Sequence, residues 1–396
     1  MNEPDEPLRI ALAIPHLGGG GAERSALKLV RGFIERGYHV DILVFEKIDT
    51  LADEIPAEAR LIELKPGPIH DIHDHIHLVR RFGYRILKFL RRSLLQDARS
   101  MAAYIDAEQP DCVLPSLPRA KSATLLAICF SRLGPVVIPT IHSVLINRKR
   151  RFRSLYSILF PMADRLVTVS DGVADNLSTN LEFPREKISR IYNPADTEEI
   201  TKLARDVPEH PWMSDDGPPV ILAAGRLARV KDYPTLLQAF RQVSRNRDVR
   251  LIILGEGSWR RRLEKMIRKM GLQEKVSLPG WVSNPYAFMS RATLFVLSSR
   301  NEGLGNVLIE AMACGCPCVS TDCPSGPAEI LNNGRFGPLV PVGDDSALAA
   351  AMERVLDSPP GKEALLARAQ EFSFDASLDQ YERLILDLVR ERRRTL

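Results

Sequence analysis

The sequence lacks any uninterrupted apolar run long enough to span a bilayer. The nearest candidate, Ala123 to Ile141, is broken by an arginine, a glycine and two prolines, whereas a membrane-spanning helix needs about 20 consecutive apolar residues. The first residues are acidic and precede a short apolar run, which is the wrong polarity for a secretory signal peptide. We therefore expect neither a membrane-spanning helix nor a secretion signal.

Cysteine is also sparse, with six residues and no regular framework. Disulfide-rich domains belong to oxidising compartments, so this usage favours a reducing one. Four cysteines fall close together, at Cys314, Cys316, Cys318 and Cys323, without the Cys-x-x-Cys pairs of zinc sites. Their spacing suits a turn and a buried strand. The cluster from His70 to His77 is the other conceivable metal site, but nothing nearby completes it, and we expect no bound metal.

Positive charge gathers in one part of the chain, although the formal net charge is only +4. Between Arg80 and Arg165 there are 16 Lys or Arg residues against 5 Asp or Glu. At the start of that window, the segment Leu78 to Leu95 has an apolar residue at every fourth position and basic residues between. This pattern is typical of a helix lying in a membrane interface, or of a domain helix with a solvated basic face.

The run Arg148 to Arg153 is the densest basic segment of the chain. A basic block of this kind favours a partner that carries phosphates, either anionic lipid or nucleic acid. The window has no arrangement of aromatic residues that would stack bases. We therefore expect an anionic membrane surface to be contacted through residues 78–99 and 148–153, and no nucleic acid.

The first half of the chain has the pattern of a doubly wound α/β domain. An apolar strand, Arg9 to Ile14, is followed by a glycine run, a helical segment and another buried strand. Gly20 and Gly21 can let backbone N–H groups wrap a phosphate, or can form a flexible turn. His142 directly follows a later buried strand, where ligands bind in open α/β sheets, although a lone histidine is more often structural.

The second half repeats this pattern after a proline- and acid-rich stretch. We expect an N-terminal domain over 1–193, an interdomain linker over 194–218, a second domain over 219–375 and a final helix over 376–396. The second domain opens with a strand, then Gly225 and Arg226, then Lys231 before a helix. Two cations beside a glycine turn and a helix N-terminus can clamp a diphosphate leaving group, or can be ordinary surface charges.

The stretch Ser298 to Ile330 combines a glycine turn, a helix start and a buried strand. Seven residues separate Glu302 from Glu310. If a helix begins near Asn306, Glu302 lies in the loop before it and Glu310 about one turn inside. Both carboxylates can then face a ligand whose phosphates lie at the helix N-terminus, or they have no joint task.

The setting EGLGNVLIEAMACGCPCVST resembles the signature of retaining glycosyltransferase family 4, which has the GT-B fold. The resemblance extends over nearly the whole chain, because four further segments match in the family's order. It implies two Rossmann-like doubly wound domains facing a central cleft, with the acceptor on the first domain and the donor on the second. It also implies that the final helix crosses back to the first domain.

The resemblance assigns a role to each matching residue. In this family Glu302 would contact the donor sugar, Glu310 the nucleotide ribose, and Arg226 and Lys231 the pyrophosphate. The catalytic set implied is Glu302, His142, Arg226 and Lys231. The substrate and nucleotide-binding set is Gly20, Gly21, Arg226, Lys231, Val282, Glu302, Gly303, Leu304, Gly305, Asn306 and Glu310.

The chain departs from the family pattern at two turns. Asp232 stands where the signature Gly-Arg-Leu-x-x-x-Lys-Gly ends in glycine. Ser325-Gly326-Pro327 stands where many members carry Gly-Gly. These replacements make the backbone shape of both turns an open question at the level of sequence.

The resemblance implies transfer of a hexose or N-acetylhexosamine from a nucleotide diphosphate sugar to a hydroxyl, with retention. A UDP-sugar donor is favoured, and the acceptor is expected to be lipid-linked or a polysaccharide. The nucleotide sugar is a substrate, so we expect no cofactor. The alternatives are a GDP-mannose-dependent mannosyltransferase, a GT-B-like nucleotide-sugar epimerase and a non-catalytic sugar-nucleotide or membrane-binding module. The expected location is cytoplasmic and peripheral, at the inner face of the cytoplasmic membrane of a bacterium.

Overall fold

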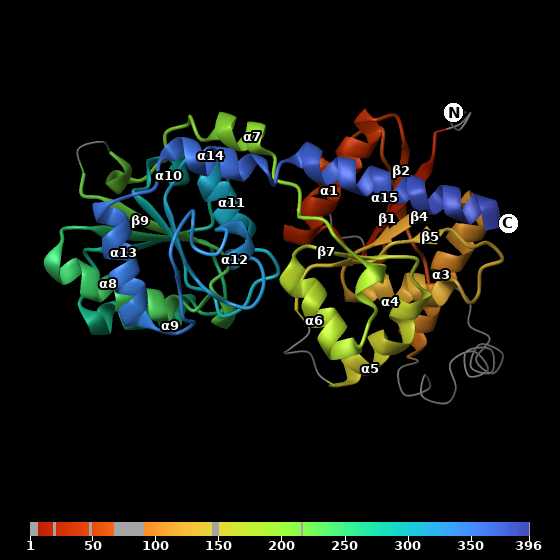
Figure 1. Ribbon diagram of the computed structural model, residues 1–396, viewed down its shortest axis with the longest axis horizontal. Coiled ribbons are helices and arrows are strands. Elements are labelled where there is room, and N and C mark those ends of the chain that lie inside the picture. Colours follow the sequence, from red (N-terminus) through yellow and green to blue (C-terminus); the bar gives the residue numbers. More distant parts are fainter. Residues whose placement is uncertain are drawn as a thin grey trace. The chain divides into compact units, whose positions relative to one another are not determined.

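The chain folds into two compact units, each of which is described by itself (Figure 1). The computed structural model describes residues 7–18, 21–46, 50–66, 91–144, 150–214 and 217–395. The first unit comprises Met1–Pro194 with Ser377–Leu396, and the second comprises Ala195–Ala376. Gly20 and the cluster from His70 to His77 therefore lie outside the described residues.

The first unit is built on parallel strands. Its main sheet has the order β3-β2-β1-β4-β5, and a smaller sheet has the order β6-β7-β8. A parallel bridge from Ser116 to Thr140 connects the end of β4 to β6. The strands are β1 (Arg9–Ile14), β2 (His39–Val44), β3 (Arg60–Glu63), β4 (Cys112–Pro115), β5 (Val136–Val137), β6 (Thr140–Ile141), β7 (Leu166–Thr168) and β8 (Ile188–Arg190).

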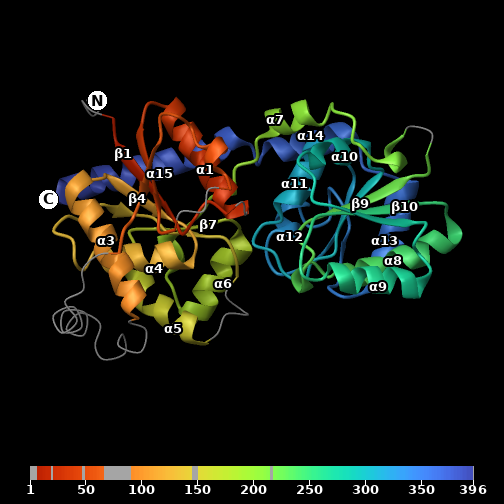
Figure 2. The ribbon, with the colours of Figure 1, turned by 180° about the vertical axis from the view of Figure 1, so that it is seen from behind.

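Helices cover both faces of this sheet (Figures 1 and 2). They are α1 (Gly21–Glu35), α3 (Arg92–Glu108), α4 (Pro118–Ala127), α5 (Arg150–Leu159), α6 (Asp171–Leu181) and the C-terminal α15 (Phe374–Thr395). From Ser377 onward α15 belongs to the first unit. Its Glu382 accepts hydrogen bonds from Arg36 and, at 2.7 Å, from the Tyr38 hydroxyl. These contacts hold the end of the chain against the loop between α1 and β2.

The second unit has six parallel strands in the order β11-β10-β9-β12-β13-β14. This is the order of a doubly wound dinucleotide-binding sheet, with β9 in the place of the first strand. The strands are β9 (Val220–Ala224), β10 (Arg250–Leu254), β11 (Val276–Gly280), β12 (Leu294–Leu297), β13 (Cys318–Thr321) and β14 (Leu339–Val340). The helices are α7 (Thr197–Leu203), α8 (Tyr233–Asn246), α9 (Arg260–Met270), α10 (Pro285–Arg291), α11 (Asn306–Ala313), α12 (Pro327–Ile330), α13 (Asp345–Asp357) and α14 (Lys362–Gln370).

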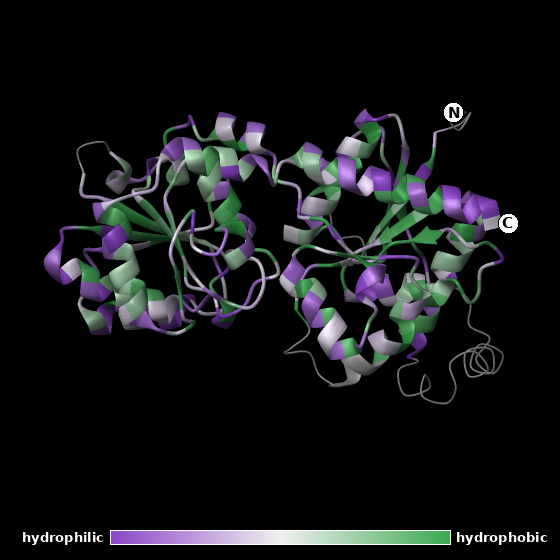
Figure 3. Ribbon diagram, in the orientation of Figure 1, coloured by the Kyte–Doolittle hydropathy of each residue, from purple (hydrophilic) through white to green (hydrophobic). Residues whose placement is uncertain are grey.

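Strands buried on both faces explain the near-continuous apolar runs of the sequence. Ile221, Leu251 and Leu294, from three neighbouring strands, are fully buried with Phe240 of α8. Coloured by hydropathy, the strands are apolar at the centre of each unit, and the helices carry their polar residues outside (Figure 3). The four cysteines from Cys314 to Cys323 are free and buried in this interior.

The stretch 194–218, expected to be a linker, contains folded structure that belongs to the second unit. Within it α7 is capped by Asp196, whose carboxylate accepts from the Glu199 N–H at 2.9 Å. The Asn284 amide donates to the Leu203 carbonyl at 2.9 Å, and the Ser290 hydroxyl to the Ala204 carbonyl at 2.8 Å. The proline- and acid-rich composition of this stretch concealed a short helix that is hydrogen-bonded to α10.

The prediction of a single basic helix over Leu78 to Leu95 is wrong at its C-terminal end. Residues 78–90 lie outside the described part of the chain, but Arg91 is extended and α3 begins at Arg92. Helix α3 buries Leu95 and Ala98, so the face that it turns inward differs from the predicted apolar stripe, which runs through Leu94. Of the run Arg148 to Arg153, Arg150 onward opens α5. Over the described residues, we find no helix with the length and apolar content needed to cross a membrane.

The buried carboxylate of Asp41 ties β2 to β3 and α3. Arg60 donates two hydrogen bonds of 2.9 Å to it, and the Tyr104 hydroxyl donates one of 2.6 Å. Burial by itself would raise the pKa of Asp41, but the hydrogen bonds from Arg60 and Tyr104 outweigh burial and lower it below its ordinary value. The folded unit therefore stabilises the ionised carboxylate.

We expect Asp41→Ala to lower the free energy of unfolding by about 2 kcal/mol at pH 7, since hydrogen bonds to a charged group are lost. A depressed pKa contributes stability above the unfolded value of about 3.9, and that contribution disappears as the pH falls through the folded value. Urea unfolding of both proteins at pH 7 and near pH 3 measures this. A difference that persists undiminished at the lower pH would contradict the assignment.

Candidate active site

The candidate site in the second unit lies where the strand order reverses. Strand β9 pairs on one side with β10 and on the other with β12. The connections that leave the carboxyl ends of β9 and β12 therefore run in opposite directions, and ligands of such sheets bind in the crevice between them. After β9 the chain carries Gly225, Arg226 and Lys231, and after β12 it carries Glu302.

Lys231 and Glu302 meet at this point. The Lys231 Nζ lies 2.7 Å from Glu302 Oε1, and their side chains are 17% and 14% exposed. The same carboxylate oxygen accepts a hydrogen bond of 2.7 Å from Ser299 Oγ. Ser298 fixes the other end of the lysine, because its hydroxyl donates to the Lys231 carbonyl at 2.8 Å. The two serines that follow β12 thus orient both members of the ion pair.

The turn after β9 approaches its neighbours too closely for most side chains. Gly225 has φ +147°, and a Cβ atom there would lie 3.0 Å from Lys231 Cε and 3.2 Å from the Tyr233 hydroxyl. That hydroxyl donates to the Gly225 carbonyl at 3.0 Å. Burial, and then the charge of Glu302, raise the pKa of Tyr233. The tyrosine is a neutral support beneath the turn.

Both turns that depart from the family's glycines keep a left-handed backbone. Asp232 has φ +47° and Ser325 has φ +77°. The Asp232 carboxylate accepts from the Thr235 hydroxyl at 2.8 Å and lies 3.0 Å from the Arg300 guanidinium. The Ser325 hydroxyl donates to the Gly303 carbonyl at 2.5 Å. Side-chain hydrogen bonds thus stabilise a conformation that glycine adopts without strain.

The glycine turn after β12 ends in helix α11, as expected from the sequence. Gly305, with φ +96°, precedes the first residue of the helix, Asn306, and Glu310 lies half-buried in the second turn. Leu304 is buried beneath the turn, and a Cβ atom on Gly326 would lie 1.9 Å from its carbonyl oxygen. The N-terminus of α11 carries the positive end of the helix dipole, which favours an anion.

The remaining expected residues of this unit follow neighbouring strands. Arg226 is exposed directly after the turn at Gly225. Val282 is half-buried after β11, beside Trp281, which is 68% exposed. Asn284 then caps α10, since its side-chain oxygen accepts from the N–H groups of the second and third helical residues. Arg226, Lys231, Val282, Glu302 and Glu310 all lie at or just beyond the carboxyl edge of one sheet.

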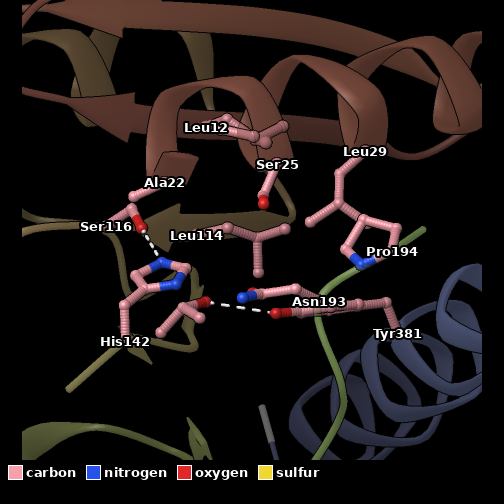
Figure 4. A pocket seen from close by; sticks show the side chains of 12 residues that line it. Leu12, Ala22, Ser25, Leu29, Leu114, Ser116, His142, Asn193, Pro194 and Tyr381 are labelled. Carbon is pink, nitrogen blue, oxygen red and sulfur yellow. Dashed lines mark hydrogen bonds between the residues drawn. The ribbon is translucent and has the colours of Figure 1, made fainter. Parts of the chain in front are cut away.

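Gly21 and His142 belong to the first unit, where His142 is held by the protein itself. Its Nε2 lies 2.7 Å from the Ser116 hydroxyl (Figure 4), and Asn193 is a second hydrogen-bonding partner. Burial, and then the charge of Lys121, lower the pKa of His142 to about 3, although the Asn193 contact works in the opposite direction. A neutral imidazole donates through one ring nitrogen and accepts through the other.

A small cavity of about 20 Å³ lies beside His142, which is enough for one water molecule. The hydroxyls of Thr140 and Tyr381 are 3.3 Å apart in its wall, so the C-terminal helix contributes to it. The lining residues are Leu12, Ala22, Ser25, Ala26, Leu29, Leu114, Ser116, Thr140, His142, Asn193, Pro194 and Tyr381 (Figure 4).

Sequence reasoning did not identify the residues that orient the expected ones. Ser299 supports Glu302, and Ser116 supports His142. Ser116 directly follows β4, and Ser299 is the second residue after β12; both strands are buried and lie next to a reversal of strand order. A search for polar residues in those positions would have found them.

The chain matches two family models that together span most of its length. Residues 19–199 match the model for Glycosyltransferase Family 4, and residues 209–372 match the model for glycosyl transferases group 1. A Campylobacter jejuni N-acetylgalactosamine-N,N'-diacetylbacillosaminyl-diphospho-undecaprenol 4-alpha-N-acetylgalactosaminyltransferase is 29% identical, over 91% of this chain and 94% of its own. The lipopolysaccharide core biosynthesis glycosyltransferase LpsE of Rhizobium meliloti is also 29% identical, over 93% and 97%.

Solved structures agree with this fold. A glycosyltransferase from Rickettsia africae superimposes with a TM-score of 0.79 at 20% identity, covering 97% of this chain and 99% of that one. Anabaena HepE, solved with UDP, gives 0.74 at 18% identity, covering 96% and 100%. The two Rossmann-like units are those of a GT-B enzyme, and the chain belongs to glycosyltransferase family 4.

Proposed function

We propose that this glycosyltransferase moves a hexose or N-acetylhexosamine from a nucleotide diphosphate sugar to a hydroxyl of a lipid-linked or polysaccharide acceptor, with retention. The observation that carries the proposal is the Lys231–Glu302 pair, 2.7 Å apart at the switch point of a doubly wound sheet. UDP is the favoured carrier, since HepE was solved with UDP. The Campylobacter jejuni relative is named for a diphospho-undecaprenol-linked acceptor, which supports an acceptor of that class.

Departure of a nucleoside diphosphate creates negative charge that must be stabilised. Lys231 supplies a cation that is mostly buried, Arg226 supplies an exposed one, and the N-terminus of α11 adds backbone N–H groups. Charge-assisted contacts in a site shielded from water are the largest single contribution to many such reactions. These protein groups would then stabilise the departing diphosphate, as a metal ion does in other transferases, and we propose that no cofactor is needed.

The two carboxylates would have separate tasks in this mechanism. Glu302 accepts from Lys231 and Ser299 through one oxygen, Oε1. A carboxylate has further lone pairs, which leaves it able to accept from hydroxyls of the donor sugar. Glu310, one turn inside α11, would accept from the ribose hydroxyls. His142, neutral at physiological pH, would contact the donor sugar from the first unit after exchanging one of its present hydrogen bonds.

A screen of donors and acceptors tests the function. UDP-glucose, UDP-N-acetylglucosamine, UDP-N-acetylgalactosamine and GDP-mannose are each incubated with undecaprenyl-diphosphate-linked N-acetylhexosamines and with soluble glycans. We expect release of UDP and glycosylation of a lipid-linked acceptor, with the product α- or β-configured as the donor was. Isomerisation of the donor without an acceptor would indicate an epimerase instead.

We also propose that the basic segments hold the enzyme peripherally on an anionic membrane, at the inner face of the cytoplasmic membrane. Each Lys or Arg near such a surface contributes about 1 kcal/mol. In the same screen, acceptor is therefore supplied in neutral and in anionic vesicles. Faster transfer and co-sedimentation with anionic vesicles at low salt are expected, and Arg81, Arg85, Lys88 and Arg92 changed together to Glu should abolish the difference.

Lys231→Ala should lower kcat by about 10²–10³-fold, the usual cost of removing one stabilising group from a shielded site. Arg226→Ala should cost less, because Arg226 is exposed and its charge is screened by solvent. Steady-state kinetics with UDP-sugar measures both, and activity should survive EDTA. Arg247→Ala is the matched control, since Arg247 pairs with Asp357. Wild-type kcat in a folded Lys231→Ala variant would overturn the phosphate clamp.

Glu302→Gln should lower kcat strongly and leave the Kd for UDP nearly unchanged, because Glu302 addresses the sugar. Glu310→Gln should instead raise the Kd for UDP by about tenfold, which corresponds to one hydrogen bond to a charged group. Calorimetry with UDP and turnover assays separate the two effects. Glu363→Gln, on the exposed first turn of α14, should change neither quantity. The opposite ranking of the two variants would reverse the assignment.

A further inference from the structure

The loop that precedes α8 is joined to the loop that follows β12 at several points. The Arg300 N–H donates to the Val230 carbonyl at 2.8 Å, and the Ser298 hydroxyl donates to the Lys231 carbonyl at the same distance. These two carbonyls belong to the peptide groups on either side of the Lys231 Cα atom. The backbone of the lysine is therefore held at both ends, while its Nζ pairs with Glu302.

A second ion pair lies one residue further along the same loop. Asp232 is 3% exposed, and its Oδ2 lies 3.0 Å from Arg300 Nε. The Arg300 side chain is half exposed, and within the described part of the chain it has no other ion pair. A carboxylate as buried as that of Asp232 needs partners, because an unpaired buried charge is costly. Thr235 supplies a hydrogen bond of 2.8 Å, and Arg300 supplies the opposite charge.

The backbone at Asp232 gives this pair a bearing on the lysine. Asp232 has φ +47°, in the left-handed region that few residues other than glycine, asparagine and aspartate adopt. It is the residue between Lys231 and Tyr233, the first residue of α8. Since each residue has only two soft dihedral angles, a change in either angle of Asp232 would move Lys231 relative to the helix. The ion pair with Arg300 opposes such a change.

Lys231 needs a fixed backbone because its side chain must change partner. Its Nζ lies 2.7 Å from Glu302, whereas in the proposed reaction it contacts the departing diphosphate. A lysine side chain is a flexible stem of four carbons, so the position of its backbone decides which atoms the Nζ can reach. A misplacement of about 1 Å in an active site can lower a rate by a factor of about 100.

We propose that Asp232 and Arg300 are positioning residues, which hold Lys231 where its Nζ can reach the leaving diphosphate. The assignment rests on the proposed function and deepens it, because it names the groups that align one catalytic cation. An ion pair with a purely structural role would stabilise the second unit without any link to Lys231. The two roles therefore differ in whether the effect of Arg300 on catalysis depends on the lysine.

The test is a double-mutant cycle between Arg300→Gln and Lys231→Ala, with the acceptor and the UDP-sugar identified in the screen above. Arg300→Gln keeps the backbone N–H and removes only the charged side chain. We expect it to lower kcat by about tenfold, as a displaced catalytic group does, and to leave the KM for donor within about twofold. In the Lys231→Ala background the same change should alter kcat by less than about twofold, whereas independent effects would add. Arg300→Lys, which keeps the charge, should recover much of the loss.

A second cycle joins Arg300→Gln to Asp232→Gly. Glycine is the residue that the family signature carries at this place, and it adopts the positive φ without strain. Asp232→Gly should lower kcat by a factor similar to that of Arg300→Gln, and the double variant should be no slower than the slower single variant, because both changes remove the same ion pair. Arg247→Gln is the matched control, since Arg247 pairs with Asp357 in the same unit, and it should leave kcat within about twofold.

An equal loss from Arg300→Gln in both backgrounds would overturn the proposal, because Arg300 would then act independently of Lys231, as it would by touching the ligand itself. Wild-type kcat in Arg300→Gln or in Asp232→Gly would overturn it as well. If the wild type transfers no sugar in the screen, the proposed function fails, and both cycles are measured instead on the Kd for UDP by calorimetry. Coupling between Arg300 and Lys231 in that measurement would support the positioning pair, and additivity or an absence of UDP binding would contradict it.

Discussion

The ion pair between Lys231 and Glu302 depends on the order of the strands that bring it together. The two residues are 71 positions apart, and they meet because β9 and β12 are neighbours whose carboxyl ends share one edge. Ser298 and Ser299 then hold the lysine backbone and the glutamate side chain. The parallel sheet fixes where the charges converge, and the serines fix how they are oriented. The chemistry of the second unit follows from that convergence.

Much of this could be predicted from sequence, because strands buried on both faces give unmistakable apolar runs. The strand Arg9–Ile14 agrees with the structure to the residue, and α11 begins at Asn306 as expected. The doubly wound class was predicted from the strand, loop, helix and strand pattern and from the family resemblance, but the order of the strands was not predicted. The short strand β3, in which three of the four residues are exposed, has no apolar run and was not predicted.

The sequence was less informative where polar residues face other polar residues. The pairing of Ser116 with His142, and of Ser299 with Glu302, depends on loops that pack at a sheet edge, and spacing along the chain does not reveal it. The prediction of one helix over Leu78 to Leu95 was wrong at Arg91. It was based on apolar residues at every fourth position, whereas the helix that begins after Arg91 buries Leu95, which is not one of them. The stretch 194–218 was expected to be a connector because it is rich in prolines and acidic residues. Acidic residues also cap helices, as they do at α7, and a proline also begins a short helical turn.

The left-handed residues Asp232 and Ser325 have a consequence for how such chains are recognised. A non-glycine residue in this region costs roughly 1–2 kcal/mol in backbone strain, which the side-chain hydrogen bonds of both residues oppose. A glycine at either place would leave the unfolded chain with more freedom to lose on folding. The two turns are consequently stiffer than their glycine counterparts. A motif search that requires glycine at these two positions would score this chain poorly, although its backbone has there the positive φ angles that glycine usually provides.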